Sequence, residues 1–246
     1  MTEKEIIVLP VTREIIEKTM LNTQKKYSYT YKTLMYNRTP IELLDNIYMG
    51  DIAKKALVSY LRSHSISVID YDEIRTDNFM EHDPGWDFKI GEKMITVEVK
   101  SSIPPNNEPK SNLIKYRDIK ITASHDKGKT WINPEDIDSN IHIQIYFYTK
   151  PYRNGYDSFD TLASDISTNY HLIDKIINAS KYNEPLFAGW TTKENIIEYL
   201  NTLPKGQRTW TFSWTSRIYW KCPISQASNM SELINLIKSP SQKEES

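Results

Sequence analysis

The chain is poor in cysteine and contains no long apolar run. Cys222 is the single cysteine among 246 residues, so no disulfide can close within one chain, and a reducing, cytoplasmic setting is the simplest expectation. No stretch approaches the roughly 18 consecutive apolar residues of a membrane-spanning helix, and the N-terminus lacks the layout of a signal peptide. We therefore expect a soluble protein with no membrane partner.

Glycine is scarce as well, and several common catalytic motifs are missing. None of the seven glycines has the spacing of a phosphate-binding loop or a dinucleotide-binding turn, which disfavours a standard nucleotide-binding fold. The sequence has no G-x-S-x-G elbow and no H-E-x-x-H pair, and one cysteine cannot build a cysteine-rich zinc site. A catalytic site in this chain would therefore be built from carboxylates and lysines.

Neither sign of charge is in excess. Lysine and arginine together number 31, against 32 for aspartate and glutamate. No global basic field requires a nucleic-acid partner, although a local basic patch can still bind phosphates.

The length suits one large domain or a core with an added subdomain. We divide the chain into an N-terminal, partly helical segment (1–45), a core (46–182), a C-terminal helix with an aromatic β-hairpin (183–238) and a polar tail expected to be disordered (239–246). The aromatic hairpin is a candidate element for target recognition.

Two helices can be placed from their patterns. Residues 41–64 carry an apolar stripe at helical spacing, with an expected break at Gly50, after which Asp51 would cap the new helix. Thr191 followed by Glu194 predicts a capping box at the start of a second helix. Residues 158–182 also read as helical.

The most informative stretch is HDPGWDFKIGEKMITVEVKSS, residues 82–102, which reads as a tight β-hairpin. Glycine favours the first position of a two-residue turn, here at 91–92. That turn pairs Phe88 with Ile95 and Asp87 with Thr96.

Side-chain alternation along this hairpin separates charge from apolar surface. Asp87, Glu98 and Lys100 share one face, and the two acids become diagonal neighbours about 7–8 Å apart. The opposite face is entirely apolar and consists of Trp86, Phe88, Ile90, Ile95, Val97 and Val99.

Two carboxylates that converge on one point repel each other unless a cation lies between them. A hard divalent ion with oxygen ligands, Mg²⁺ or Mn²⁺, suits such a pair, and a nearby lysine can orient water or neutralise a phosphate. These parts together describe metal-assisted phosphodiester hydrolysis. The alternative interpretation is a solvated sheet face with a cross-strand ion pair, which contributes only about 0.2–1 kcal/mol.

Asp87, followed after ten residues by Glu98-Val99-Lys100, resembles the D…E-x-K signature of the PD-(D/E)xK nuclease superfamily. The resemblance covers roughly residues 45–150 and is closest to restriction-endonuclease-like DNA nucleases. It implies an α/β fold, a mixed central sheet flanked by helices, with the motif on the second and third core strands. It also implies that Asp87 and Glu98 bind the metal ion and that Lys100 is the catalytic lysine.

The chain departs from that family in one place. Many relatives carry another glutamate on the preceding helix, where this chain has lysines at 54 and 55. Asp51 or Glu42 would substitute, or the site would bind its metal with two acids only. Gln144 and His142, on a strand predicted over 140–150, are expected to support the site from the same face.

Basic residues that follow the motif, or lie in the aromatic hairpin, are candidate contacts to a DNA backbone. They could equally form a solvated surface. They are Lys110, Lys115, Arg117, Lys120, Lys127, Lys129, Arg208 and Arg217.

The expected function is therefore Mg²⁺-dependent cleavage of double-stranded DNA, and the favoured class is a type II restriction endonuclease. A homodimer is expected, since a DNA site with two-fold symmetry matches a protein with two-fold symmetry. Such an enzyme can have a cognate methyltransferase as a partner, which this sequence does not show. The alternatives are a structure-specific or defence nuclease, such as a junction resolvase-like protein, and a DNA-binding module of the same fold without catalysis.

Overall fold

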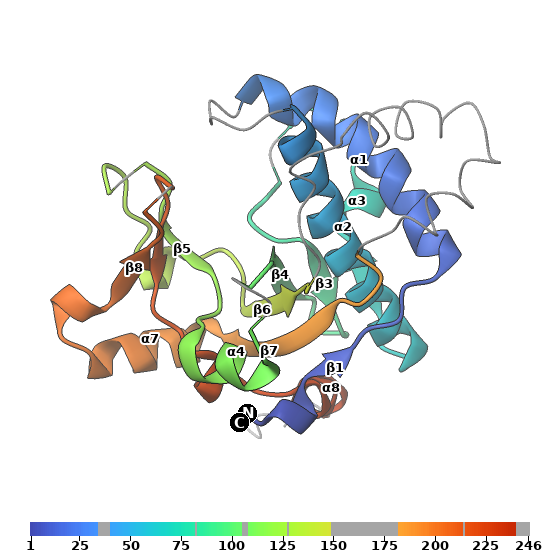
Figure 1. Ribbon diagram of the computed structural model, residues 1–246. Coiled ribbons are helices and arrows are strands. Elements are labelled where there is room, and N and C mark those ends of the chain that lie inside the picture. The colour runs from blue at the N-terminus through green and yellow to red at the C-terminus, as the bar shows by residue number, and fades with distance from the viewer. Residues whose placement is uncertain are drawn as a thin grey trace, which may run out of the picture.

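The computed structural model describes residues 1–33, 40–81, 83–104, 108–126, 128–148, 182–213 and 215–239. It is an α/β structure with a mixed six-stranded sheet flanked by helices and a separate three-stranded sheet (Figure 1). The coarse fold class expected from the sequence is thus confirmed. The predicted helix over 158–182 and the predicted tail lie outside the described residues, apart from Tyr182 and Ser239.

The large sheet has the order β1-β7-β6-β4-β3-β2. Its strands are β1 (Ile7–Val8), β2 (Val68–Asp70), β3 (Phe88–Ile90), β4 (Ile95–Ser102), β6 (Ile141–Tyr146) and β7 (Leu186–Thr192). The pairs β2/β3, β3/β4, β6/β7 and β1/β7 are antiparallel, and β4 and β6 are parallel. The motif strands therefore lie in the interior of a mixed sheet.

Helices α1 (Arg13–Thr33), α2 (Pro40–Ser63) and α3 (Tyr71–Ile74) lie together on one side of this sheet (Figure 1). The apolar stripe of α2, which includes Ile52 and Leu57, joins Phe88, Val97 and Ile143 of the sheet in one fully buried core. Burial of this apolar area is the main stabilising contribution in this half of the molecule. Helix α8 (Met230–Lys238) packs Met230 and Leu233 into the same core.

A second apolar core lies beside Tyr146, Leu186 and Ala188 of the large sheet. Helices α4 (Lys110–Tyr116) and α7 (Lys193–Thr202) contribute Leu113 and Leu200 to it. This core also joins the three-stranded sheet, in which β9 (Ile218–Trp220) lies between β5 (Ile121–Ser124) and β8 (Thr209–Thr211). The aromatic strand pair predicted in the C-terminal part of the chain is β8 and β9.

Short 3-10 turns connect these elements. They are η1 (Glu3–Glu5), η3 (Pro134–Asp136), η5 (Lys205–Gln207) and η6 (Ile224–Gln226). Within the described ranges, no helix combines the length and the apolar character that crossing a bilayer requires.

The predicted helix break at Gly50 is wrong. Helix α2 continues through Gly50, and Asp51 lies in its interior rather than at an N-cap. A single glycine costs a helix about 1 kcal/mol relative to alanine, and the buried neighbours Met49, Ile52 and Ala53 offset that cost.

The cap of α7 is shifted by one residue from the predicted capping box. Thr192 is the N-cap, and its hydroxyl accepts a hydrogen bond from the N–H of Asn195 at 3.1 Å. Thr191 is instead buried in β7. The strand β7 continues to Thr192, which moves the start of the helix.

Strand β7 contains an irregularity at Gly189, opposite Gln144 of β6. Gly189 has a φ of +131°, a conformation that side chains with a Cβ rarely adopt. A Cβ on Gly189 would also lie 2.7 Å from the Cβ of Ala227. This position therefore requires glycine for two independent reasons.

We predict that Gly189→Ala lowers the free energy of unfolding by about 2 kcal/mol or more, because it combines backbone strain with overpacking. Gly206→Ala is the matched control, since nothing lies within 4 Å of a Cβ there, and it should change stability by less than about 0.5 kcal/mol. Urea unfolding of both variants tests the prediction. Equal stabilities would contradict the close approach of β7 to Ala227.

Candidate active site

The hairpin that carries the predicted acids has a longer turn than predicted. Ile90 pairs with Ile95, so residues 91–94 form the turn. The N–H of Met94 donates to the carbonyl of Gly91 at 3.3 Å, and Gly91 has the positive φ (68°) that glycine tolerates.

The predicted register was therefore wrong by two residues, because Phe88 pairs with Val97 rather than with Ile95. A shift of two residues leaves every side chain on its original face, since the side-chain period of a strand is two. Glu98 and Lys100 accordingly lie on the face opposite Val97, as expected.

Asp87 lies immediately before β3, where its main chain and its carboxylate both bind β4. Its N–H donates to the carbonyl of Val97 at 2.8 Å, and its Oδ2 accepts from the N–H of Val99 at 2.7 Å. The Asp87 carboxylate is thus held against the residue that separates Glu98 from Lys100.

The environment of Asp87 disfavours its ionised form. Burial raises the pKa of Asp87 to about 6, and the nearby charge of Glu98 acts in the same direction. Lys54, the Val99 N–H and Lys100 offset part of this rise. A carboxyl group shifted in this way by burial and a like charge is typical of a functional site.

Glu98 is held from two sides. Its Oε1 forms an ion pair with Lys100, and its Oε2 lies 3.1 Å from Nδ1 of His142, the residue paired with it on β6. Although burial acts against ionisation, Lys100 and His142 lower the pKa of Glu98 to about 2. The pKa of Lys100 is raised, because Glu98 and Asp87 outweigh the effect of its burial.

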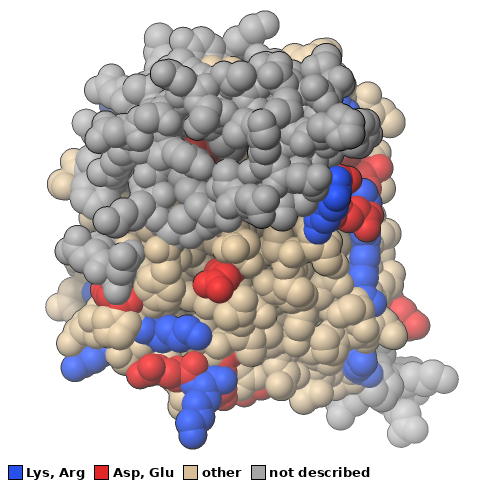
Figure 2. Space-filling view, turned by 45° about the vertical axis from the view of Figure 1, so that its right-hand side comes forward, with Lys and Arg blue, Asp and Glu red and all other residues tan. Residues whose placement is uncertain are grey.

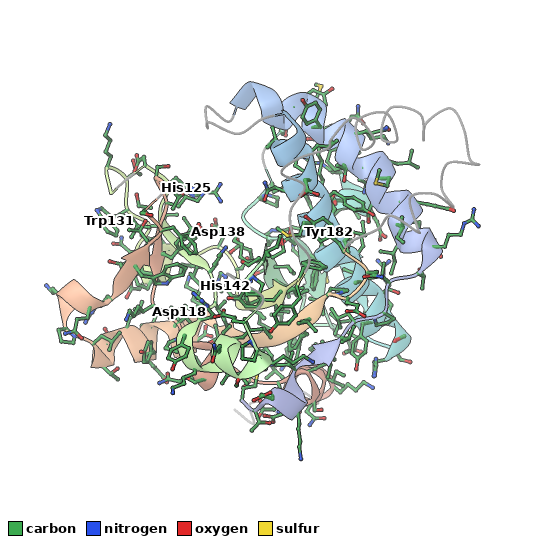
Figure 3. All side chains as sticks on the ribbon, viewed as in Figure 1. Asp118, His125, Trp131, Asp138, His142 and Tyr182 are labelled. Carbon is green, nitrogen blue, oxygen red and sulfur yellow. The ribbon has the colours of Figure 1, made fainter. Side chains whose placement is uncertain are left out.

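His142 is where the sequence predicted it, on the face shared with Glu98, and Figure 3 labels it on the large sheet. Its side chain is 1% exposed, and its Nε2 has no hydrogen-bond partner among the residues that the structure describes. The Glu98 side chain is 24% exposed and that of Lys100 30% exposed. Solvent therefore reaches the acid and the lysine, while the histidine lies behind them.

Gln144 lies on the same face but is fully buried and does not present its amide to a substrate. Its Nε2 lies 3.0 Å from the carbonyl of Lys100 and 3.1 Å from Oγ of Ser102. Its Oε1 accepts from the N–H of Lys120 at 3.2 Å. Gln144 therefore positions the main chain of Lys100 and ties it to the segment that leads into β5.

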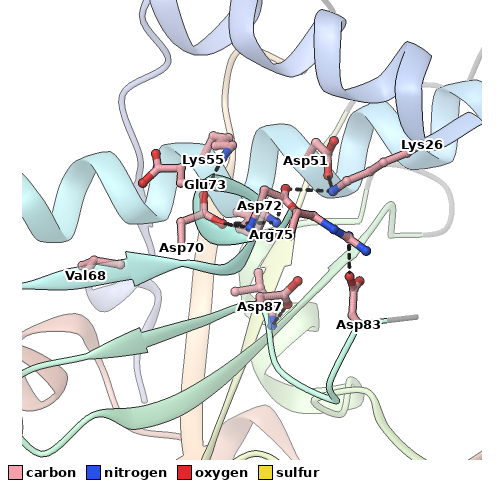
Figure 4. Close-up of polar contacts among 12 residues, drawn as sticks. Lys26, Asp51, Lys55, Val68, Asp70, Asp72, Glu73, Arg75, Asp83 and Asp87 are labelled. Carbon is pink, nitrogen blue, oxygen red and sulfur yellow. Dashed lines mark hydrogen bonds and ion pairs between the residues drawn. The ribbon is translucent and has the colours of Figure 1, made fainter. Parts of the chain in front are cut away.

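Asp51, the proposed third metal ligand, belongs to a buried ionic cluster between α1, α2, β2 and α3 (Figure 4). The cluster contains three lysines and three aspartates: Lys26, Lys54, Lys55, Asp51, Asp70 and Asp72. Oδ1 of Asp51 accepts from Nζ of Lys26 at 2.6 Å. Asp51 is thus engaged by a lysine, and burial raises its pKa.

Lys54 connects this cluster to the candidate site. It binds Asp72 and lies 3.5 Å from Oδ1 of Asp70, which is fully buried. Its side chain is 5% exposed, yet its pKa is raised, because the charges of Asp70, Asp72 and Asp87 outweigh its burial. The cluster therefore places the positive charge of Lys54 near the carboxylate of Asp87.

The donor set of the site consists of hard oxygen atoms from two acids. In the described part of the chain, no three His, Cys, Asp or Glu side chains are grouped so as to hold a metal ion, and the side chain of Glu42 lies outside that part. Mg²⁺ is commonly bound through one or two carboxylates, with waters and substrate phosphates as the other ligands. Asp87 and Glu98 supply carboxylate oxygens, the kind of ligand that such an ion takes.

The predicted DNA contacts differ in their exposure and in their partners. Arg117 forms a two-point ion pair with Glu108 (2.6 and 2.7 Å), and Nε of Arg208 donates to the carbonyl of Leu203. Lys115 and Lys129 are exposed, Lys110 and Lys120 are half-buried, and Lys127 lies outside the described residues. On the face shown in Figure 2, basic and acidic side chains are interspersed, so the described residues there form no continuous basic surface.

Two residues near the site were not predicted. Lys54 lies in the buried stripe of α2. The signal in the sequence that could have identified it is a lysine among the small apolar residues Ala53 and Ala56. The pKa of His125 is lowered by its burial and by the charges of Arg217 and Lys100. No sequence pattern indicates His125, because only the pairing of β5 with β9 brings it beside Arg217.

No family model matches the chain, and searches of curated proteins and of solved structures find no match to it either. The function must therefore be argued from the geometry of the site.

The raised pKa of Asp87 predicts a pH-dependent stability. In the metal-free protein, stability is lost as pH rises through about 6 and recovered below about 3.8, the ordinary value for aspartate. Asp87→Asn removes this penalty and should be more stable than the wild type near pH 8, by at most about 3 kcal/mol (about 1.4 kcal/mol per unit). The difference should vanish near pH 4.

Thermal unfolding of both proteins in EDTA across this pH range measures the effect. Glu92→Gln, at an exposed acid in the turn of the same hairpin, controls for the loss of one negative charge. A wild-type protein that is more stable than Asp87→Asn at high pH would contradict the assigned environment of Asp87.

Proposed function

We propose that this protein is a metal-dependent endonuclease that hydrolyses phosphodiester bonds of DNA, with Asp87, Glu98 and Lys100 as its catalytic residues. The observation that carries the proposal is the convergence of the two carboxylates on β4, beside a lysine that Glu98 holds in place. An ion pair on a solvated sheet face would require only Glu98 and Lys100, two residues apart on β4, and not an acid with a pKa raised to about 6 next to them.

The arrangement of the strands supports a restriction-endonuclease-like fold of the PD-(D/E)xK superfamily. A long helix, α2, precedes the three antiparallel strands β2, β3 and β4, and β6 then joins β4 in parallel. The acidic motif spans the second and third of these strands, where the resemblance in sequence would place it.

Asp87 and Glu98 would hold Mg²⁺ or Mn²⁺ through their carboxylate oxygens. The chemistry that such an ion supplies is Lewis-acid activation of water and compensation of phosphate charge. Asp87 is suited to this role because a nearby cation would relieve the cost of its ionisation. The hydrogen bond that its carboxylate accepts from the N–H of Val99 fixes its orientation.

Lys100 would act on the reacting phosphate. Its side chain is 30% exposed, and its positive charge can stabilise the negative charge that develops on the phosphate oxygens or orient the attacking water. Glu98 and the main-chain contact from Gln144 position it. His142 would hold Glu98 from behind, because it contacts the carboxylate oxygen that Lys100 does not use.

Restriction of duplex DNA by a homodimer is the form of this function that we favour, with a methyltransferase as its cellular counterpart. A structure-specific or defence nuclease would use the same three residues, and the digestion pattern separates these alternatives.

We predict that the purified protein cleaves plasmid and phage DNA with Mg²⁺ but not with EDTA. Lys100→Ala should lower the rate by about 100-fold or more, since a group that stabilises developing charge contributes at least that much. Lys93→Ala is the matched control, because Lys93 is an exposed residue in the turn of the same hairpin, and it should cleave like the wild type.

Agarose gels of the digests decide between the forms of the proposal. Discrete bands indicate a sequence-specific endonuclease, whereas a smear or nicking alone indicates the structure-specific or defence form. A folded protein that shifts DNA without cutting it would support a binding module. The absence of both cleavage and DNA binding would overturn the proposed function.

A further inference from the structure

Arg217 stands apart from the other arginines in the described part of the chain. The guanidinium groups of five of the six arginines there have a partner. Four bind a carboxylate, namely Arg13 with Glu17, Arg62 with Glu73, Arg75 with Asp77 and Arg117 with Glu108. The fifth, Arg208, binds the main-chain carbonyl of Leu203. Within the same residues, the guanidinium of Arg217 forms no hydrogen bond or ion pair, and its bonds use the main chain only. A half-buried guanidinium in this state is suited to an external anion.

The three-stranded sheet fixes the position of Arg217 beside His125. Arg217 immediately precedes β9, and Ile218 pairs with Ser124 at the end of β5. Oγ of Ser216 donates to the carbonyl of His125 at 3.0 Å. Figure 3 shows His125 at this end of the sheet. The imidazole and the guanidinium therefore come from two strands that pair directly.

A chain of hydrogen bonds connects this sheet to the candidate active site. Gln144 binds the carbonyl of Lys100 with its Nε2 and the N–H of Lys120 with its Oε1, and β5 begins one residue after Lys120. Burial lowers the pKa of His125, and the charges of Arg217 and Lys100 lower it further. Lys100, Arg217 and His125 thus share one electrostatic environment.

Lys100 and Arg217 carry like charges, which disfavour each other unless an anion lies between them. The acids whose charges act on Lys100 and His125 are Glu98, Asp87 and Asp126. In the described part of the chain these acids contact other groups and none forms an ion pair with Arg217. The Arg217 guanidinium is therefore left there without an acidic partner.

The three-stranded sheet contains more basic than acidic residues. Its described segments, 118–126, 128–131, 208–213 and 215–221, contain five lysines or arginines and two aspartates. Both aspartates are engaged internally: Asp118 accepts from the N–H of Cys222, and Asp126 accepts from Thr130 and Ser124. On a chain with a net charge of −1, this sheet therefore has a local excess of positive charge.

We propose that Arg217, with His125 beside it, binds the phosphate backbone of the DNA strand that enters the active site, so that the three-stranded sheet is the arm that holds the substrate. This inference rests on the proposed nuclease function. A guanidinium can bind two phosphate oxygens through parallel N–H groups. Gln144 holds the three-stranded sheet in a fixed position relative to Lys100.

Fluorescence anisotropy of a labelled DNA duplex, titrated with the protein at several salt concentrations, tests the arm. The titrations use Mg²⁺ and a Lys100→Ala background, in which cleavage is suppressed. Arg217→Gln should weaken binding about tenfold and reduce the slope of log affinity against log salt by about one, since one phosphate contact is lost. Arg217→Lys keeps the charge and should retain the slope.

Lys238→Gln is the matched control, because it removes one positive charge from α8 at the end of another element. It should leave both affinity and slope unchanged. If Arg217→Gln and Lys238→Gln have equal affinities and slopes while the wild type cleaves DNA, the proposed role of Arg217 is wrong and the nuclease function still stands. A wild-type chain that neither binds nor cleaves DNA would overturn the proposed function and the arm together.

Discussion

The buried ionic cluster between the helices and β2 is the interaction on which the site depends. Three lysines and three aspartates balance their charges there, and most of these side chains are nearly inaccessible to solvent. Removal of one partner from such a network leaves an uncompensated buried charge and costs roughly 3–5 kcal/mol. The cluster fixes α1 and α2 against β2, and through Lys54 it also sets the electrostatic environment of Asp87. Stability and candidate chemistry are thus coupled in one group of residues.

The two acids of the site have opposite environments. Asp87, with one N–H donor and a like charge nearby, has a pKa of about 6, whereas Glu98, between Lys100 and His142, has a pKa of about 2. Near neutral pH both are ionised, but only Asp87 is poorly compensated by the protein itself. A divalent cation would supply the missing charge at the position where the substrate phosphate also has to be held.

The sequence predicted the polar face correctly because strand alternation does not depend on the length of the turn. The register was off by two residues, and Glu98 and Lys100 still share a face. Long-range packing decided the features that local patterns did not predict. Neighbours in the core keep α2 continuous through Gly50, Lys26 engages Asp51, and Gln144 is buried under the segment that leads into β5. His125 comes near Lys100 only through the pairing of distant strands, which no local pattern records.

The most direct test of the account is the location of Mn²⁺ in crystals of the protein grown with that ion, by anomalous scattering. The account predicts a peak in contact with the carboxylates of both Asp87 and Glu98, and its loss in Glu98→Gln. A fully occupied peak elsewhere, or no peak while both carboxylates remain beside Val99, would contradict the claim that these acids form a metal centre.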